Sequence, residues 1–110
     1  MSIEDRLADL GIDLPPVAKP VAAYVPAIQV GDQISTSGQL PLISGSLPMT
    51  GLVGDQISQE DAAGQARVAA LNALAAAADV AGGVNNIRRV IRVVVYVASA
   101  ADFTAQPAVA

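Results

Sequence analysis

The chain carries few side chains that could act as catalysts. It has no histidine and no cysteine, so the commonest general base and the thiol nucleophile are both missing. No Ser–His or Cys–His pair can form within the chain, and no thiolate metal site can form either. Chemistry performed by a carboxylate or by a bound water molecule remains. The sequence therefore predicts no metal ion and no other cofactor.

The cationic side chains are also few. The only lysine, Lys19, could in principle form a Schiff base, but it precedes a proline in an expected loop with no sign of an activating apolar pocket. Arg88, Arg89 and Arg92 flank the start of an apolar stretch, where pairing with nearby acids is the favoured interpretation over an anion site. With a net charge of −4, the chain lacks the cationic face that nucleic-acid binding needs. Ribonuclease activity is therefore not expected.

The composition predicts an oligomer. The chain has the length of one domain, 110 residues, and 53% of them are hydrophobic while 15% are charged. A domain of this size buries only about 60–70% of its chain surface, which leaves apolar surface uncovered. The longest apolar runs, 73–78 and 93–98, are far shorter than the ~20 residues of a membrane span. The acidic, amphipathic start is no signal peptide, so a cytoplasmic location and burial against other subunits are expected.

The first half of the chain predicts a short helix followed by a hairpin. Ser2 is a candidate N-cap for a helix over 3–10 that Gly11 ends, and prolines keep the following segment extended. Alternation over 22–30 predicts a strand in which Pro26 marks a sheet edge or a bulge. Gly31-Asp32 suits a type II′ turn, and the return strand covers 33–40. Residues 42–53 predict a loop or an irregular hairpin.

The second half predicts a long helix and a buried strand. Ser58 and Asp61 resemble a capping box, and the alanine-rich helix that follows should end at Gly82-Gly83. Its long apolar residues Val68, Leu71 and Leu74 fall on one side. Residues 87–98 are rich in β-branched side chains on both faces, which predicts an interior strand with cover on each side. A further helix should begin after Asp102. We divide the chain into a helix and extended lead-in, 1–20, and one domain, 21–110.

Four blocks in this order resemble the Rid family, the YjgF-type proteins also described as endoribonuclease L-PSP-like. They are VAAYV at 21–25, ISTSGQLP at 34–41, ARVAALNAL at 66–74, and VVYV at 94–97 followed by Asp102-Phe103. The resemblance covers roughly residues 20 to 107. Members of the family continue with a second helix, two more strands, an arginine that binds the substrate carboxylate, and a glutamate. None of these is matched here, and we do not transfer the role of that arginine to Arg88, Arg89 or Arg92.

The resemblance implies an α+β, chorismate-mutase-like fold with helices packed on one face of a sheet, assembled as a homotrimer with small-molecule clefts between subunits. The C-terminal helix and strands of that fold would be missing. It also implies a substrate-binding set consisting of Tyr24, Ser37, Gly38, Val97 and Phe103. Each has an ordinary alternative: a half-buried strand aromatic for Tyr24, a turn for Ser37-Gly38, and core packing for Val97 and Phe103.

The best-understood family members hydrolyse enamines and imines such as 2-aminoacrylate to 2-keto acids and ammonia. The resemblance therefore implies a deaminase, a hydrolase of the 2-iminobutanoate/2-iminopropanoate type. A site of tyrosine, serine and backbone groups is adequate for this chemistry, because holding a carboxylate and placing one water are most of the task. The alternative is a non-catalytic trimer that binds 2-keto acids. Ribonuclease or translation-inhibitor activity ranks third.

Overall fold

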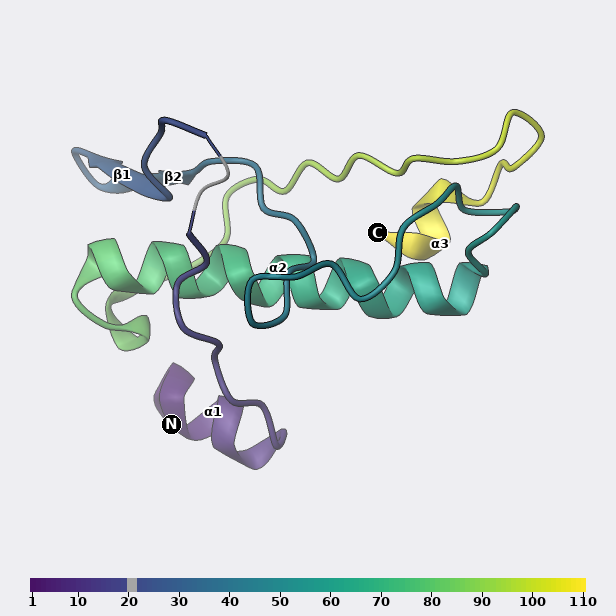
Figure 1. Cartoon of the computed structure of the whole chain (residues 1–110). Helices are drawn as coiled ribbons and strands as arrows, with labels where there is room; N and C mark the ends of the chain where they lie inside the picture. Colours follow the sequence, from purple (N-terminus) through teal and green to yellow (C-terminus); the bar gives the residue numbers. More distant parts are fainter. Residues whose placement is uncertain (20–21) are drawn as a thin grey trace.

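The computed structural model describes residues 1–19 and 22–110 (Figure 1). The predicted domain boundary falls on residues 20 and 21 and so lies outside the described residues. Along the chain the elements are α1 (Ile3–Asp9), β1 (Ala27–Val30), β2 (Gln33–Thr36), α2 (Gln59–Ala81), the 3₁₀ turn η1 (Val84–Asn86) and α3 (Gln106–Val109).

Helix α1 is stabilised mostly by its own ends. The Ser2 hydroxyl accepts from the Asp5 N–H at 3.0 Å, and the Asp5 carboxylate accepts from the Ser2 N–H at 3.2 Å, so a full capping box forms. At the other end Gly11 takes a left-handed φ of +68°, which confirms the predicted end of the helix. α1 buries no residue. It attaches to η1 through Glu4, whose N–H donates to Asn85 Oδ1 at 2.9 Å.

The predicted hairpin is confirmed, with shorter strands. β1 and β2 are antiparallel, with Val30 paired to Gln33 across the turn. Gly31 has a φ of +60°, as the first central residue of a type II′ turn requires. The strand expected over 22–30 begins only at Ala27, directly after Pro26, because proline has no N–H to donate to a ladder. The return strand expected to reach residue 40 ends at Thr36.

Helix α2 starts and ends where the sequence predicts. The Asp61 N–H donates to the Ser58 hydroxyl at 3.1 Å, which is half of the predicted capping box; the structure shows no return bond from the Ser58 N–H to the Asp61 carboxylate among the described residues. At the C-terminus Gly82 has a φ of +80°, and the Gly83 N–H donates to the Ala78 carbonyl at 2.8 Å. This pattern is a Schellman end, which satisfies carbonyls that the helix itself leaves unpaired.

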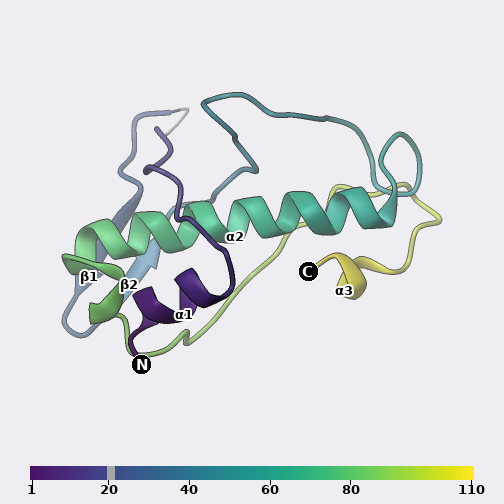
Figure 2. The same cartoon turned by 90° about the horizontal axis from the view of Figure 1, so that it is seen from below.

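All other packed elements except α1 lie against α2. The hairpin and η1 contact its C-terminal half, and α3 contacts its N-terminal half (Figures 1 and 2). The most deeply buried helix residues are small alanines and Asn72, whereas the three long apolar residues Val68, Leu71 and Leu74 are half-buried. Alanines let the other elements approach the helix backbone closely, so α2 is the element against which the hairpin, η1 and α3 pack.

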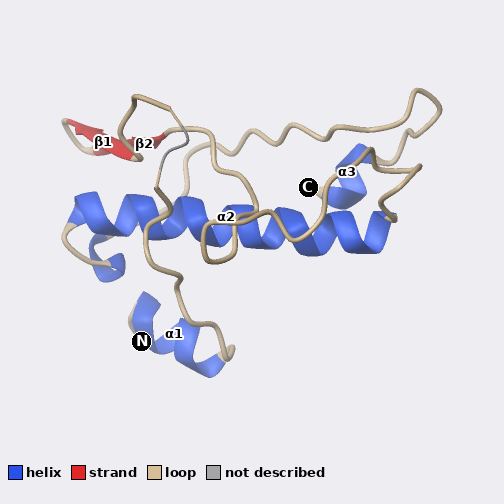
Figure 3. Cartoon of the chain, viewed as in Figure 1, coloured by secondary structure: helices blue, strands red, loops and turns tan. Residues whose placement is uncertain are grey.

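The predicted interior strand over 87–98 is wrong for this structure. The segment runs along the length of α2 as an extended chain that is loop throughout (Figure 3). Its side chains are largely exposed, with Val93 at 70% and Tyr96 at 92%. Only at its end do described residues bridge it, where Val53 pairs with Ser99 in parallel. β-branched residues favour an extended backbone, but a strand also needs a neighbour to accept and donate its ladder hydrogen bonds.

The last helix begins later than predicted. α3 is one turn, Gln106–Val109, and not a continuation from Asp102. Gln106 stabilises the approach to it: its amide Nε2 donates to the Phe103 carbonyl at 2.8 Å and to the Ser99 hydroxyl at 3.0 Å. Val109 is buried, so this turn closes the N-terminal end of α2.

Candidate functional site

The segment that leaves β2 is tied to the residue that precedes β1. The backbone N–H of Ser37 donates to the Pro26 carbonyl at 2.8 Å, and the Ser37 hydroxyl donates to the same oxygen at 3.2 Å. Gln39 Nε2 in turn donates to the Ser37 hydroxyl at 3.2 Å. The Ser37 hydroxyl is thus occupied both as donor and as acceptor. Its observed role is to hold the open end of the hairpin and the start of the following loop.

A buried amide fixes the next part of this loop against α2. Asn72 is 1% exposed, and its Nδ2 donates to the carbonyls of Leu40 at 2.9 Å and Leu42 at 3.1 Å. A buried amide is stable only when it is hydrogen-bonded, and here it pairs with two carbonyls that have no strand partner. Sequence reasoning did not assign this role. The signal was a single polar residue within the apolar, alanine-rich part of the helix.

These two anchors enclose a small crevice. Its lining residues are Ala18, Lys19, Tyr24, Gly38, Gln39, Leu40 and Leu42. The crevice holds about 10 Å³, roughly the space of one water molecule. Tyr24 is 43% exposed at this position. The structure therefore brings two of the predicted site residues, Tyr24 and Gly38, to one crevice, with Ser37 next to it in the chain.

The other two predicted residues lie in a different place. Val97 and Phe103 pack against a buried cluster made by Val53, Ala62 and Val109 at the N-terminal end of α2. Within this cluster Phe103 lies on the backbone of loop 51–57: a Cβ on Gly54 would come within 2.9 Å of the phenylalanine side chain. The hairpin and α3 lie over opposite halves of α2 (Figure 1). One chain therefore presents the predicted site as two separate groups.

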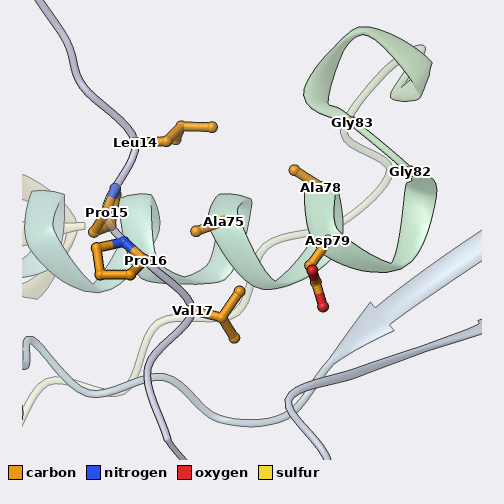
Figure 4. A pocket seen from close by; sticks show the side chains of 9 residues that line it. All are labelled: Leu14, Pro15, Pro16, Val17, Ala75, Ala78, Asp79, Gly82 and Gly83. Atoms are coloured by element: carbon orange, nitrogen blue, oxygen red, sulfur yellow. The ribbon is translucent and has the colours of Figure 1, made fainter.

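A second, larger cavity contains none of the predicted site residues. It is an open groove of about 450 Å³ between the extended lead-in and the C-terminal end of α2 (Figure 4). The lead-in contributes Leu14, Pro15, Pro16 and Val17, and the helix end contributes Ala75, Ala78, Asp79, Gly82 and Gly83. The groove is mainly apolar and carries one charged side chain, the carboxylate of Asp79.

Two further classes of site are absent from residues 1–19 and 22–110. No three carboxylate, histidine or cysteine side chains there come close enough together to hold a metal ion. None of the helices in that part of the chain combines the length and hydropathy that crossing a bilayer requires. The candidate site is therefore the crevice beside Tyr24, which is built from a phenol, an amide, an ammonium group and backbone.

The family model described as "YjgF/chorismate mutase-like, putative endoribonuclease" matches residues 4–106, nearly the whole chain. The chain belongs to the YjgF family. The resemblance read from the four sequence blocks is confirmed.

Two solved structures are similar to this YjgF chain. A protein of unknown function from Agrobacterium tumefaciens, Atu1372, is 35% identical, with a TM-score of 0.74 over 98% of this chain and 65% of its own. A protein from Shewanella oneidensis MR-1, described as a "putative endoribonuclease", is 34% identical, with a TM-score of 0.71 over 76% of this chain and 56% of its own. The chorismate-mutase-like fold class is therefore confirmed.

A further relative has a similar identity to this chain and is likewise longer than it. Protein TCP17 of Trypanosoma cruzi is 35% identical over 105 residues, which is 96% of this chain and 66% of the relative. The YjgF chain thus spans about two thirds, or less, of the length of these three relatives.

Proposed function

We propose that this YjgF chain acts as a homotrimer whose intersubunit clefts hydrolyse small enamines and imines, of the 2-aminoacrylate type, to 2-keto acids and ammonia. The observation that supports this most is the crevice beside Tyr24. It has space for about one water molecule and is lined by hydrogen-bonding groups without any histidine, cysteine or carboxylate. Hydrolysis of an imine consumes one water and needs no strong nucleophile from the protein.

The reaction sets modest demands on such a site. A proton moves to the terminal carbon of the enamine, which gives the imine; water then adds to the C=N carbon, and ammonia leaves as the carbonyl of the keto acid forms. The protein must hold the substrate and place the water, and positioning of this kind accounts for much of enzymatic rate enhancement. The phenol of Tyr24 can both donate to and accept from that water, as can the side-chain amide of Gln39.

The separation of the predicted residues supports an assembled site. One chain offers Tyr24 and Gly38 at one end of α2, and Val97 and Phe103 at the other. In a trimer the first pair of one subunit would face the second pair of its neighbour, with the extended segment 87–98 in the interface. That segment exposes a row of apolar side chains, and covering it would remove the apolar excess predicted from the composition.

The test is ammonia release from 2-aminoacrylate generated in situ, on a sample whose mass is measured by light scattering. A trimer should accelerate release over buffer. Replacing Tyr24 with Phe should lower the rate about tenfold, the effect of losing one well-placed hydrogen bond. Leu10→Ala is the control, because Leu10 lies at the end of α1, outside both the crevice and segment 87–98. A confirmed trimer that gives no acceleration would rule out the deaminase.

The second candidate is a non-catalytic trimer that binds 2-keto acids in the same cleft. It is favoured by the Ser37 hydroxyl, which is committed to Pro26 and Gln39 and so is not available to activate a nucleophile. Saturable pyruvate binding without any turnover would select it. RNA cleavage that stays with the protein through every purification step would instead support the endoribonuclease description that the Shewanella relative carries, although the net charge of −4 disfavours RNA binding.

A further inference from the structure

The groove between the lead-in and the end of α2 is large enough for a small molecule. It holds about 450 Å³, within the range of roughly 300–1,000 Å³ that ligand pockets in proteins cover. On one side the successive prolines Pro15 and Pro16 fix φ and so restrict the lead-in backbone. On the other side Ala75 and Ala78 are buried and leave only methyl groups on the helix surface. The two sides together form an apolar surface whose shape is partly preorganised.

One end of this groove is electrically negative. Asp79 is its only charged lining residue, as far as the described residues show, and the Asp79 side chain is exposed. Figure 4 shows the Asp79 carboxylate pointing from the helix toward the side on which Val17 lies. Asp79 is in the last turn of α2, where the helix dipole adds negative partial charge and where no basic residue offsets it. Nothing described at this end of the groove therefore neutralises the carboxylate.

An apolar surface that ends in uncompensated negative charge suits a cation with an apolar body. The ammonium group of such a molecule would pair with the Asp79 carboxylate, while its alkyl or aryl part would cover the prolines and alanines. An anion would be repelled by the same carboxylate. A neutral apolar molecule would take water away from the carboxylate without replacing it. The crevice beside Tyr24, with about 10 Å³, has no room for a molecule of this size, so the groove is a separate site.

We propose that this groove binds small primary amines that carry an apolar body, with Asp79 holding the ammonium group and the lead-in and α2 covering the apolar part. The site is independent of the proposed deaminase, because it shares no lining residue with the Tyr24 crevice. The groove is open and Asp79 is exposed, so the ion pair is screened by water and the affinity should lie in about the millimolar range.

Titration of the intact chain with n-butylamine, and with 1-butanol and butyrate for comparison, tests the charge preference. The backbone amide NMR signals of Gly82 and Gly83, which line the groove, should shift saturably with butylamine. They should shift much less with the alcohol and not at all with the carboxylate. n-Hexylamine should bind more tightly than butylamine by about twofold per added methylene, because an open groove covers each methylene on one side only.

Two variants test the two parts of the site. Asp79→Asn should weaken butylamine binding about threefold to fivefold, the effect of losing one exposed ion pair. Glu60→Gln is the matched control, since it removes an exposed acid from the first turn of the same helix, and it should change the affinity by less than about 1.5-fold. Val17→Ser, on the lead-in side, should reduce the gain in affinity from butylamine to hexylamine.

Three results would overturn this proposal. They are butyrate binding as tight as butylamine binding, equal weakening by Asp79→Asn and Glu60→Gln, and no saturable shift at Gly82 and Gly83. The rate of ammonia release from 2-aminoacrylate should be the same in Asp79→Asn as in the original chain. Failure of the amine site and failure of the deaminase are therefore seen in different measurements.

Discussion

Helix α2 and segment 87–98 are both apolar, yet only the helix is folded by contacts within one chain. In α2 each interior N–H finds its acceptor four residues back, and the ends are closed by Ser58 and by the Gly82-Gly83 pair. In segment 87–98 the corresponding groups point to the sides, where a second strand would have to be. Among the described residues, the segment has such a partner only at its C-terminal end, where Ser99 forms a bridge with Val53.

The difference shows what each part of the molecule depends on. α2 carries its hydrogen bonds within itself and needs only a few buried alanines to hold the hairpin, η1 and α3. The segment depends on a partner for both its hydrogen bonds and its apolar cover. We therefore expect changes in and around α2 to alter the stability of the chain, and changes in the segment to alter its assembly.

The largest expected effect is on assembly. Val93→Lys places a charge on a side chain that is already 70% exposed, so the single chain should keep its stability within about 0.5 kcal/mol. In the proposed trimer the same charge would be buried without a partner, which costs several kcal/mol. The variant should therefore be monomeric at concentrations where the original chain is trimeric, as measured by light scattering.

Leu10→Lys is the control for this comparison. Leu10 is 59% exposed at the end of α1, far along the chain from the segment, and the change adds the same charge. Its mass in solution should equal that of the original chain. If both lysine variants dissociate, or if neither does, segment 87–98 is not the interface.

The next effect is on the stability of the crevice wall. Asn72→Ala removes the side-chain donor of the Leu42 carbonyl and one of the two donors of the Leu40 carbonyl, which also accepts from the Leu42 N–H at 2.8 Å. The loss of these bonds and the small void that opens should cost about 2–3 kcal/mol. Asn86→Ala is the matched control: its amide also donates to a carbonyl, that of Ala81, but in an exposed position, and should cost under about 1 kcal/mol. The denaturant midpoints of the two variants show whether the loss of the Asn72 amide lowers stability more than the loss of the Asn86 amide. Equal costs would mean that Asn72 is no anchor.

The same contrast between local and distant partners explains what could be predicted from sequence. The caps at Ser2 and Ser58, the glycine ends of both helices and the Gly31-Asp32 turn depend on residues within four or five positions, and all lie where the sequence places them. The strand over 87–98 was predicted from the β-branched composition alone. Its pairing depends on residues that local patterns do not reveal.

The candidate site followed the same rule. The family resemblance implies one set that includes Tyr24, Gly38, Val97 and Phe103. The structure brings Tyr24 and Gly38 together because they flank a local hairpin. Val97 and Phe103 instead pack at the N-terminal end of α2. Asn72 was missed because a hydrogen bond across 30 residues leaves no periodic signal.

A smaller effect tests the closing of α2 itself. Gly82→Ala forces a Cβ into the left-handed region, at a cost of about 1–2 kcal/mol. Gly64→Ala, in the interior of the same helix, meets nothing within 4 Å and has no such φ, so it should stabilise the chain by about 0.5–1 kcal/mol. Opposite signs in thermal melts are the expected result; two shifts in the same direction would contradict the assigned helix end.

The smallest expected effect is the loss of a helix N-cap, and it should differ between α1 and α2. Ser58→Ala and Ser2→Ala each remove one hydroxyl that accepts an N–H, nominally worth about 1 kcal/mol. α2 supports the packed elements of the chain, so its cap should lower the global stability by that amount. α1 buries no residue and attaches through Glu4 and Asn85, so the loss of its cap should fray that helix alone. Hydrogen exchange should then speed up within 3–9 for Ser2→Ala while α2 keeps its protection; faster exchange in α2 would mean that α1 is part of the same cooperative unit.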